Sequence, residues 1–457
     1  MAFNSLKFLF VFLPLVMAGF RLANARSRSA ALVFMIAASY TFYAFAAGWY
    51  ALLMVVSTTV DFTVGILLDR AERPARRKLI LLLSLVFNLG LLSFFKYYGF
   101  FIESVNTLAG HPVLHATLHV VLPAGISFYT FQSMGYSIDV YRRDLKPSRS
   151  FLEFASFVSL FPQLIAGPIV RPTLLLPQLA RRGPVDNSRV TDGMMLFICG
   201  LLKKVLVADR LAFYADPILN DPKGYGSVDL WLSMVAFSLQ IYFDFSGYTD
   251  MARGLARMLG LEFSINFDSP YHADSPSDFW KRWHVSLSSW LRDYLYIPLG
   301  GNRKGKRRTG VNLFLTMLLG GLWHGAGVNF LLWGAFHGSL LLAYHRMERP
   351  WARLPMLLRR GVMLLLILVS WIPFRMHTIA DLGTFLHRCS FMPRMPTAPP
   401  ALWAFVALGI GLCSLPRNSN AIRWGALGWR GTVAFAVLTL LAVLHLNLSS
   451  KFIYFAF

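Results

Sequence analysis

Apolar stretches of helical length, separated by short polar segments, occupy most of the chain. They lie near residues 5–20, 30–48, 51–68, 79–98, 118–140, 230–259, 311–323, 329–344, 361–374, 402–415 and 433–448. About 20 residues of helix cross the roughly 30 Å of hydrocarbon in a bilayer. The pattern therefore predicts an all-α polytopic integral membrane protein with about 11 to 12 transmembrane helices.

The charges of the connecting segments predict the topology. Residues 21–28 hold three Lys or Arg, residues 70–78 five and residues 142–149 four, whereas 48–50 and 99–117 hold none. Cytoplasmic loops carry the excess of Lys and Arg, so the amino terminus is expected outside, and the basic loop at 417–430 places the carboxyl terminus outside too. Two outside termini require an even number of crossings. Residues 196–208, interrupted by Lys203 and Lys204, are the candidate for the twelfth.

The first apolar run has two interpretations. Lys7, the short hydrophobic stretch and the Ala-Asn-Ala sequence at 23–25 are typical of a signal peptide. However, Arg21, Arg26 and Arg28 surround that site, and positive charge retains a segment on the cytoplasmic side. We therefore favour an uncleaved first helix.

Two segments depart from the simple spanning pattern. Residues 151–177 are apolar but contain four prolines, which predicts a re-entrant or interfacial segment, because irregular backbone at membrane depth must be buried in protein or line a cavity. Residues 279–299 are amphipathic, and Trp280, Trp283, Leu287 and Trp290 have the spacing of one side of a helix. No linker marks a second domain, so we predict a single membrane domain over 1–457.

Composition and charge agree with this interpretation. Charged residues make up 14% and apolar residues 56% of the chain, whereas ordinary globular proteins have about 25% charged residues. A soluble enzyme is therefore excluded. The net charge of +22 lies in short clusters between apolar runs, which favours topology signals and contacts with membrane lipids over nucleic acid.

Ionisable residues inside apolar stretches are candidates for function, because charge at bilayer depth is costly. Asp244 and Asp250 are six residues apart and do not share a face of a straight helix. Each therefore bonds a neighbouring helix, caps a break in a helix or contacts substrate, rather than forming an acid–base pair. His324 lies among four glycines and Trp323 within 319–327. Glycine allows close approach, and an imidazole can take a proton from an attacking hydroxyl.

Two polar segments supply further candidates for binding substrate. Residues 278–294 mix three Trp with charged side chains, and residues 300–308 combine a turn with five basic residues. Interfacial anchoring or topology would explain either segment, whereas in a binding role the basic turn would attract phosphates. The candidates are Lys281, Arg282, Trp283, Trp290, Arg292, Asp293, Asn302, Arg303 and Trp323, with Asp244 and Asp250 from the preceding segment.

We predict neither a metal site nor a permanently bound cofactor. His111, His115 and His119 recur every four residues, but Pro112 weakens the helix and no nearby Cys or acidic residue completes a ligand set. The three cysteines, Cys199, Cys389 and Cys413, are far apart, so neither a disulfide framework nor a thiolate site is indicated.

Residues 278–294 followed by 320–327 resemble the membrane-bound O-acyltransferase (MBOAT) family, in particular its bacterial branch that O-acetylates polysaccharides such as alginate or cellulose. The segments 161–169, 242–250, 298–303 and 452–455 look like the same branch. The resemblance implies the MBOAT fold, a many-helix wall around a thinned core. It also implies a catalytic His324, acting as general base, and a second active-site position at His284, which orients substrate or stabilises developing charge.

The resemblance further implies the reaction and its partners. An acetyl group would pass from a cytoplasmic thioester, acetyl-coenzyme A, to a hydroxyl for modification of a secreted exopolysaccharide. Periplasmic acetyl-relay proteins and the polysaccharide synthase complex would assist, with the enzyme in the bacterial inner membrane and both termini periplasmic. Two alternatives stay open: D-alanyl transfer to teichoic acid, and export of a polysaccharide or lipid-linked sugar. The segments 452–455 and 300–303 favour acetylation over D-alanyl transfer, and the lack of paired inverted halves counts against a transporter.

Overall fold

The computed structural model describes residues 1–115, 118, 120–181, 183, 185–376, 378–422, 428–448 and 452–453, and every regular element within them is helical. These residues form two compact units, one made of Met1–Phe197 with Met251–Ser264 and the other of Ile198–Asp250 with Ile265–Phe457. The single-domain interpretation stays a prediction.

The first unit contains the amino-terminal helices. Their bounds are η1 Phe8–Phe12, α1 Leu13–Arg26, α2 Arg28–Ala47, η2 Gly48–Tyr50, α3 Ala51–Arg70, α4 Pro74–Ala109, α5 Ile126–Arg142, α6 Phe151–Ser159, α7 Phe161–Leu164, α8 Pro172–Ala180 and most of α9 Asn187–Leu202.

The second unit contains most of α11, the helices η3, α10 and η4 that precede it, and all the helices that follow it. Its bounds are η3 Lys203–Ala208, α10 Asp209–Asn220, η4 Pro222–Gly224, α11 Ser227–Met258, η5 Pro270–His272, α12 Pro276–Arg282, α13 Val285–Leu291, η6 Arg292–Tyr296, α14 Gly305–His324, α15 Val328–Ala352, α16 Met356–Arg375, α17 Ile379–Phe391, α18 Pro400–Ser414, η7 Ser419–Ala421, α19 Trp429–Leu444 and η9 Leu446–Leu448.

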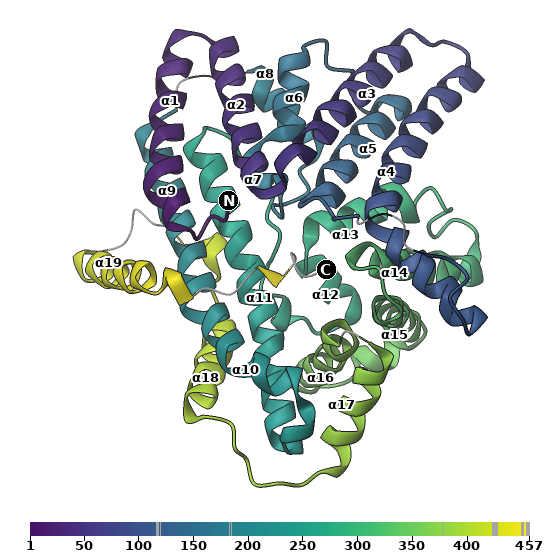
Figure 1. The fold of residues 1–457 in the computed structure, drawn as a ribbon, viewed down its shortest axis with the longest axis vertical. Helices are drawn as coiled ribbons and strands as arrows, with labels where there is room; N and C mark the ends of the chain where they lie inside the picture. The colour runs from purple at the N-terminus through teal and green to yellow at the C-terminus, as the bar shows by residue number, and fades with distance from the viewer. Residues whose placement is uncertain are drawn as a thin grey trace. The chain divides into compact units, whose positions relative to one another are not determined.

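Hydrogen bonds between apolar helices organise the first unit, where α3, α4 and α5 lie side by side (Figure 1). Asp61 of α3 is fully buried. Its carboxylate accepts hydrogen bonds from Ser84 at 2.6 Å, Asn88 at 2.9 Å and Ser137 at 2.9 Å. Because buried polar groups must find partners, this cluster fixes the register of the three helices.

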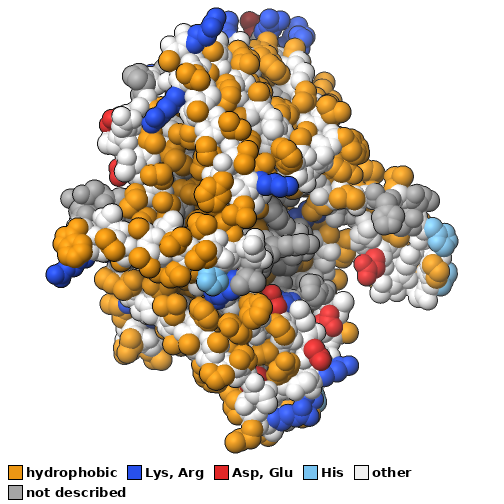
Figure 2. Space-filling view, turned by 60° about the vertical axis from the view of Figure 1, so that its left-hand side comes forward, with side chains coloured by type: hydrophobic (Ala, Val, Ile, Leu, Met, Phe, Trp, Pro, Cys, Tyr) orange, Lys and Arg blue, Asp and Glu red, His pale blue; other side chains and the backbone are white. Residues whose placement is uncertain are grey.

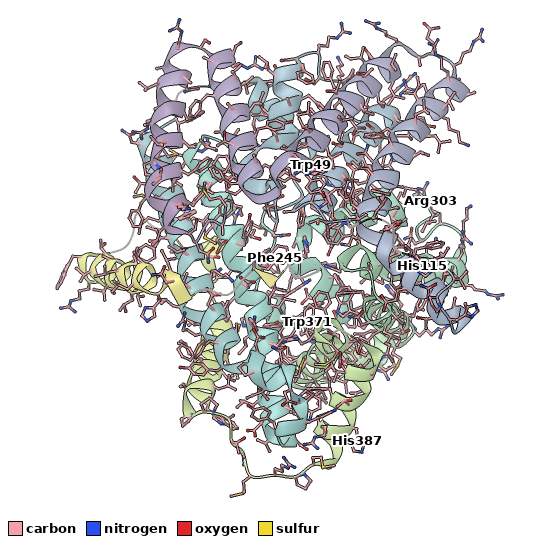
Figure 3. The ribbon with its side chains drawn as sticks, in the orientation of Figure 1. Trp49, His115, Phe245, Arg303, Trp371 and His387 are labelled. Atoms are coloured by element: carbon pink, nitrogen blue, oxygen red, sulfur yellow. The ribbon has the colours of Figure 1, made fainter. Side chains whose placement is uncertain are left out.

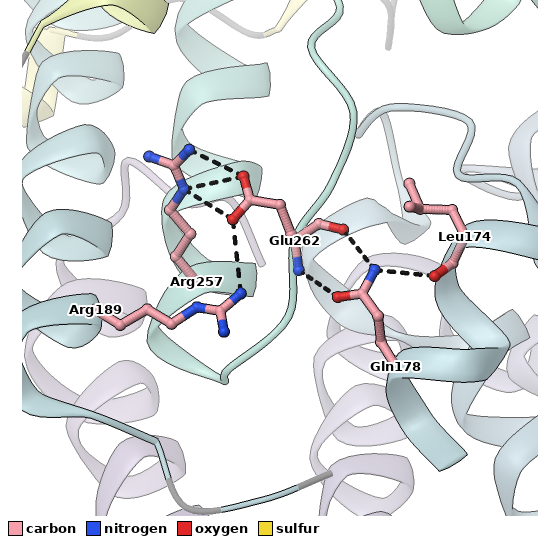
Figure 4. Close-up of polar contacts among 5 residues, drawn as sticks. All are labelled: Leu174, Gln178, Arg189, Arg257 and Glu262. Carbon is pink, nitrogen blue, oxygen red and sulfur yellow. Dashed lines mark hydrogen bonds and ion pairs between the residues drawn. The ribbon is translucent and has the colours of Figure 1, made fainter. Parts of the chain in front are cut away.

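A second polar cluster holds the extended segment after α11 in the first unit (Figure 4). Arg257 donates to the Glu262 carboxylate at 2.9 Å, and Arg189 approaches it at 3.8 Å. Gln178 of α8 accepts from the Glu262 backbone N–H at 2.8 Å and donates to its carbonyl at 3.0 Å. The paired backbone bonds fasten this segment to α8, because they satisfy both main-chain groups of one residue.

In the second unit, α14 and α15 form a tightly packed antiparallel hairpin. The two helices approach so closely that a Cβ atom on Gly334 would lie 2.5 Å from the Met317 carbonyl, and one on Gly321 would clash with the Phe330 carbonyl. Small residues allow such close helix packing. The two helices predicted by the apolar runs at 311–323 and 329–344 are therefore confirmed, and they pack against each other as a hairpin.

Five helical stretches of the described residues are long and apolar enough to cross a membrane: Phe8–Arg26, Arg28–Arg70, Pro74–Ala109, Ser227–Met258 and Met356–Arg375. The second of them joins α2 to α3, and two shorter apolar helices, Pro400–Ser414 and Trp429–Leu444, follow. Apolar side chains cover much of the face drawn in Figure 2, as expected for surface in contact with lipid. The count of 11 to 12 crossings stays a prediction.

Two predicted helices have different bounds in the structure. The span expected at 118–140 begins only at Ile126, because Pro123 and the left-handed Gly125 (φ 76°) precede it. The prediction of a single amphipathic helix over 279–299 is wrong, because the helical conformation is interrupted at Trp283 and His284, between α12 and α13. By contrast, 151–177 is broken into short helices, as its prolines predict.

Candidate active site

His324 is the last residue of α14 and lies against aromatic side chains. Its ring centroid is 5.0 Å from that of Trp323, 5.0 Å from that of Trp333 on α15 and 5.5 Å from that of Phe374 on α16. The side chain is buried, with 6% of its surface exposed. The helix ends here because Gly325 adopts extended backbone (φ −158°, ψ 154°), and the imidazole is therefore carried on a short connection between two tightly packed helices.

His284 lies at the break between α12 and α13. Its backbone has φ 43° and ψ 53°, a left-handed conformation that costs energy for any residue with a Cβ atom. The ring is fully buried, 4.7 Å from Phe245 of α11 and 6.2 Å from Trp323. His284 and His324 therefore both contact Trp323. Figure 3 labels Phe245 together with Trp371, which lies 5.1 Å from the neighbouring Trp283.

The orientation of the His284 ring is determined by Asn266. Asn266 Oδ1 is 3.1 Å from His284 Nδ1 and accepts from both the backbone N–H of Ser286 at 3.1 Å and the Ser286 hydroxyl at 2.9 Å. A backbone N–H can only donate, so this side-chain atom must be the amide oxygen. His284 Nδ1 must then carry the hydrogen.

The protonation state of His284 follows from its burial. His284 lies in a short connection outside the candidate spanning helices, and burial lowers its pKa from 6.5 to about 3. The imidazole is therefore neutral at physiological pH. With hydrogen on Nδ1, its Nε2 atom carries a lone pair, which accepts hydrogen bonds and cannot donate one.

A third imidazole, that of His337 on α15, lies beside this cluster. It is 99% buried, and its ring centroid is 4.7 Å from that of Trp333 and 5.0 Å from that of Trp280. It is stacked on Phe279 at 6.1 Å. His337 therefore packs α12 against α15 and supports Trp333, which in turn contacts His324.

The two candidate aspartates of α11 form ion pairs with adjacent lysines. Lys204 binds Asp244 at 2.7 Å and Asp209 at 2.8 Å, while Lys203 binds Asp250 at 2.6 Å. The expectation that each aspartate bonds a neighbouring helix is therefore confirmed, and their predicted role in binding substrate stays a prediction. Buried charges are tolerated when they are paired in this way.

The chain's closing residues also reach α11. The Ile453 backbone N–H donates to Asp244 at 2.8 Å, and Phe452 stacks on Tyr248 at 4.7 Å. The rest of the 452–455 motif lies outside the described residues. Part of this motif therefore contributes to the surroundings of His284, since Phe452 also contacts Phe245 at 5.9 Å.

The structure brings His284, His324, Trp283 and Trp323 into one aromatic cluster, and the other predicted binding residues lie in separate groups. Arg292 pairs with Asp293 at 2.7 Å, Arg282 pairs with Asp278 at 2.9 Å, and Trp290 packs on Tyr294. The remaining three are exposed: Lys281, Asn302 and Arg303. Ligand contacts by these residues stay predictions.

Sequence reasoning missed Asn266, Trp333, Trp371 and Phe374. Asn266 follows α11 in a stretch without periodicity, and no local pattern connects it with a histidine 18 residues later. The aromatic residues are part of ordinary apolar helices. The only local signal was the high density of Trp and His in 323–337.

No group of three or more His, Cys, Asp or Glu residues that could hold a metal ion occurs within the described part of the chain. His119, one of the three histidines considered for a metal site, lies outside it. The arrangement around His324 is instead suited to acid–base chemistry: a buried imidazole beside a second one whose tautomer is fixed.

Comparison with known proteins identifies the family. Residues 143–376, which include both histidines, match the model of the membrane-bound O-acyltransferase family. The chain is 42% identical to a "Probable alginate O-acetylase" of Pseudomonas syringae pv. tomato, over 84% of this chain and 74% of that protein. It is 33% identical to a peptidoglycan O-acetyltransferase of Helicobacter pylori, over 100% of this chain and 97% of that protein.

A weaker similarity leads to the D-alanyl branch. The chain is 27% identical to a teichoic acid D-alanyltransferase of Bacillus subtilis over 54% of this chain and 66% of that protein. The family match spans more than half of the chain, and the more similar relatives are named for O-acetyl transfer. This chain belongs to the membrane-bound O-acyltransferase family and is a multi-pass membrane O-acyltransferase.

Proposed function

We propose that this enzyme transfers an acetyl group from acetyl-coenzyme A to a hydroxyl, for O-acetylation of a secreted polysaccharide, with His324 as general base. The observation that supports this most strongly is the pair of buried imidazoles that share Trp323 as a neighbour. The O-acetyl transfer named for the relatives is the second support.

In the proposed reaction His324 takes the proton of the acceptor hydroxyl as its oxygen bonds to the thioester carbonyl carbon. The tetrahedral intermediate then breaks its carbon–sulfur bond, and the imidazolium returns the proton to the departing thiolate. The aromatic surroundings of His324 exclude water, which limits hydrolysis of the thioester. General base catalysis of this kind contributes about 10²–10⁴-fold to the rate.

His284 has a different proposed role. Stabilising negative charge on the intermediate needs an N–H aimed at the oxygen, and the only N–H of neutral His284 points to Asn266. Its Nε2 atom accepts hydrogen bonds, so His284 orients a hydroxyl of the acceptor. Of the two roles that the resemblance implies for His284, the hydrogen bond with Asn266 supports orientation of substrate.

The location of the reaction follows the distribution of charge. The basic segments, including the turn at 300–308, are expected on the cytoplasmic side of a bacterial inner membrane, where they would attract anionic acetyl-coenzyme A. The polysaccharide lies on the other side, and we propose that both termini are periplasmic. Periplasmic acetyl-relay proteins and a polysaccharide synthase complex would receive or guide the acetyl group.

The names of the relatives indicate more than one polymer as the acceptor. Relatives named for alginate are more identical to this chain, whereas the relative named for peptidoglycan matches along its whole length. Alginate, cellulose and peptidoglycan all present hydroxyls that His324 and His284 would handle alike. Sugar analysis of the acetylated polymer distinguishes them.

The test measures the amount of ester-linked acetyl on the polymer of cells that produce either the wild-type protein or His324→Ala, at matched protein and polymer levels. Loss of acetyl with normal polymer yield supports the proposal, and incorporation of labelled acetyl-coenzyme A by isolated membranes identifies the donor. Unchanged acetylation would exclude His324 as an essential base. Loss of D-alanyl esters instead would assign the enzyme to the D-alanyl branch, and loss of the polymer itself would indicate a role in export.

A further inference from the structure

A groove of about 1130 Å³ lies between the beginning of α14 and the end of α15, away from the aromatic cluster. One end of its lining is basic, with Lys306 and Arg307 from α14 and Arg346 from α15. Its wall is apolar, with Val311 and Phe314 from α14 and Leu342 from α15. The groove therefore combines a cationic end with a hydrophobic side.

The groove is too far from His324 for its basic end to contact the reacting atoms. His324 lies eighteen positions after Lys306 on the continuous helix α14, which is roughly 27 Å at 1.5 Å per residue. The apolar wall belongs to the first half of the helix. The groove is thus a second site on the hairpin that carries the proposed base.

The excess of Lys and Arg in cytoplasmic segments explains basic residues at the end of a membrane helix. It does not explain the apolar wall of the groove next to them. A ligand that matches both parts needs a negatively charged head and a hydrocarbon tail. A nucleotide such as coenzyme A is polar along most of its length and would leave Val311, Phe314 and Leu342 without an apolar partner. Basic pockets between membrane helices on the cytoplasmic side bind anionic lipid headgroups, and each Lys or Arg near the surface contributes about 1 kcal/mol.

We propose that this groove binds an anionic phospholipid of the surrounding bilayer. Lys306, Arg307 and Arg346 bind the headgroup phosphate, and one acyl chain lies along Val311, Phe314 and Leu342. The lipid contacts both helices, so it holds together the end of the hairpin opposite the Gly325–Gly327 connection. This binding does not depend on which group the enzyme transfers or to which acceptor.

The experiment compares lipid binding by the purified full chain, measured by native mass spectrometry with phosphatidylglycerol and phosphatidylcholine of identical acyl chains. The wild type is expected to prefer phosphatidylglycerol by more than about tenfold. The variant Lys306→Gln/Arg307→Gln/Arg346→Gln should lose that preference. Lys304→Gln/Arg308→Gln/Arg349→Gln is the matched control, because it removes three exposed basic residues outside the groove lining: Lys304 at the N-cap of α14, Arg308 on α14 and Arg349 on α15.

The melting temperature of each variant shows that it is folded, and Leu342→Gln supplies a second test without a change of charge. That variant should weaken binding of phosphatidylglycerol but not of glycerol 1-phosphate, which has the charge without the tail. Equal loss of preference in the groove variant and the control would overturn the proposal, since it would reflect net charge alone. Displacement of the lipid by coenzyme A would also overturn it.

Discussion

The surroundings of His284 and His324 differ in what holds each imidazole. His284 is held by hydrogen bonds, because Asn266 accepts from its Nδ1 and from the backbone N–H of Ser286. His324 is held by the faces and edges of Trp323, Trp333 and Phe374. A hydrogen-bond network fixes which nitrogen carries the proton. The proton of His284 is therefore fixed on Nδ1, and the proposed mechanism gives the transferred proton to His324.

The largest effect is expected from His324→Ala, which removes the general base. Acetyl transfer should fall by about 10²–10⁴-fold, while the protein remains folded, because the side chain lies at a helix end. The measurement is the rate of acetyl incorporation at matched protein level. The control is His387→Ala on α17, an exposed histidine labelled in Figure 3, which should act like the wild type; equal losses in both variants would contradict the assignment.

The variant His284→Asn keeps the hydrogen bond to Asn266 but removes the hydrogen-bond acceptor Nε2. Asparagine tolerates the left-handed backbone of this position and can donate to Asn266 from its amide, but it has no acceptor where Nε2 lies. A misplaced substrate group costs on the order of 10²-fold in rate, so kcat should fall by about that amount with an unchanged melting temperature. Wild-type turnover in this variant would show that His284 only shapes the backbone.

Asn266→Asp changes the charge next to His284 and keeps the accepting oxygen. A carboxylate favours the imidazolium, so it raises the pKa of His284. Protonated Nε2 no longer accepts, and activity should therefore fall as the pH decreases through the raised pKa, by about tenfold per pH unit below it. The pH profile of the wild type should lack this ionisation. Identical profiles would argue against Asn266 as the residue that positions His284.

The smallest effect concerns stability and pH. The folded pKa of His284, about 3, lies below its ordinary 6.5, so the unfolded state binds the proton more readily. The contribution of His284 to the free energy of unfolding is fully present above pH 6.5 and is lost as the pH falls towards 3. The loss is about 1 kcal/mol between pH 6.5 and 5.5. The melting temperature of the wild type should decrease over this interval more than that of His284→Asn. Parallel curves for the two proteins would exclude His284 as a source of acid sensitivity.

Local patterns predicted the helical elements well and the surroundings of the site poorly. The α14–α15 hairpin follows from two apolar runs around Gly325 and Gly327. The break before α5 follows from Pro123 and Gly125, whereas hydropathy alone predicts a span that begins at 118. The break at His284 has no such signal, because a left-handed histidine is a strained conformation held by tertiary contacts.

The buried lysines show the same limit. In the sequence, Lys203 and Lys204 only interrupt an apolar stretch, although Asp244 and Asp250 on α11 are recognisable as costly in a membrane. Pairing between them needs the two helices to lie side by side, and a single sequence does not show which helices are neighbours. Likewise, Asn266 is recognisable only through the atoms that it contacts.

The most direct test of the central claim, that His324 and His284 act on one acceptor with different roles, is a double-mutant cycle of acetyl transfer. Residues that act as a unit have strongly non-additive effects. The rate of His324→Ala/His284→Asn is expected to equal that of His324→Ala within a few-fold, because orienting the acceptor hydroxyl does not raise the rate once the base is absent. A double variant whose loss equals the product of the two single losses would show that the histidines act independently and would contradict the account.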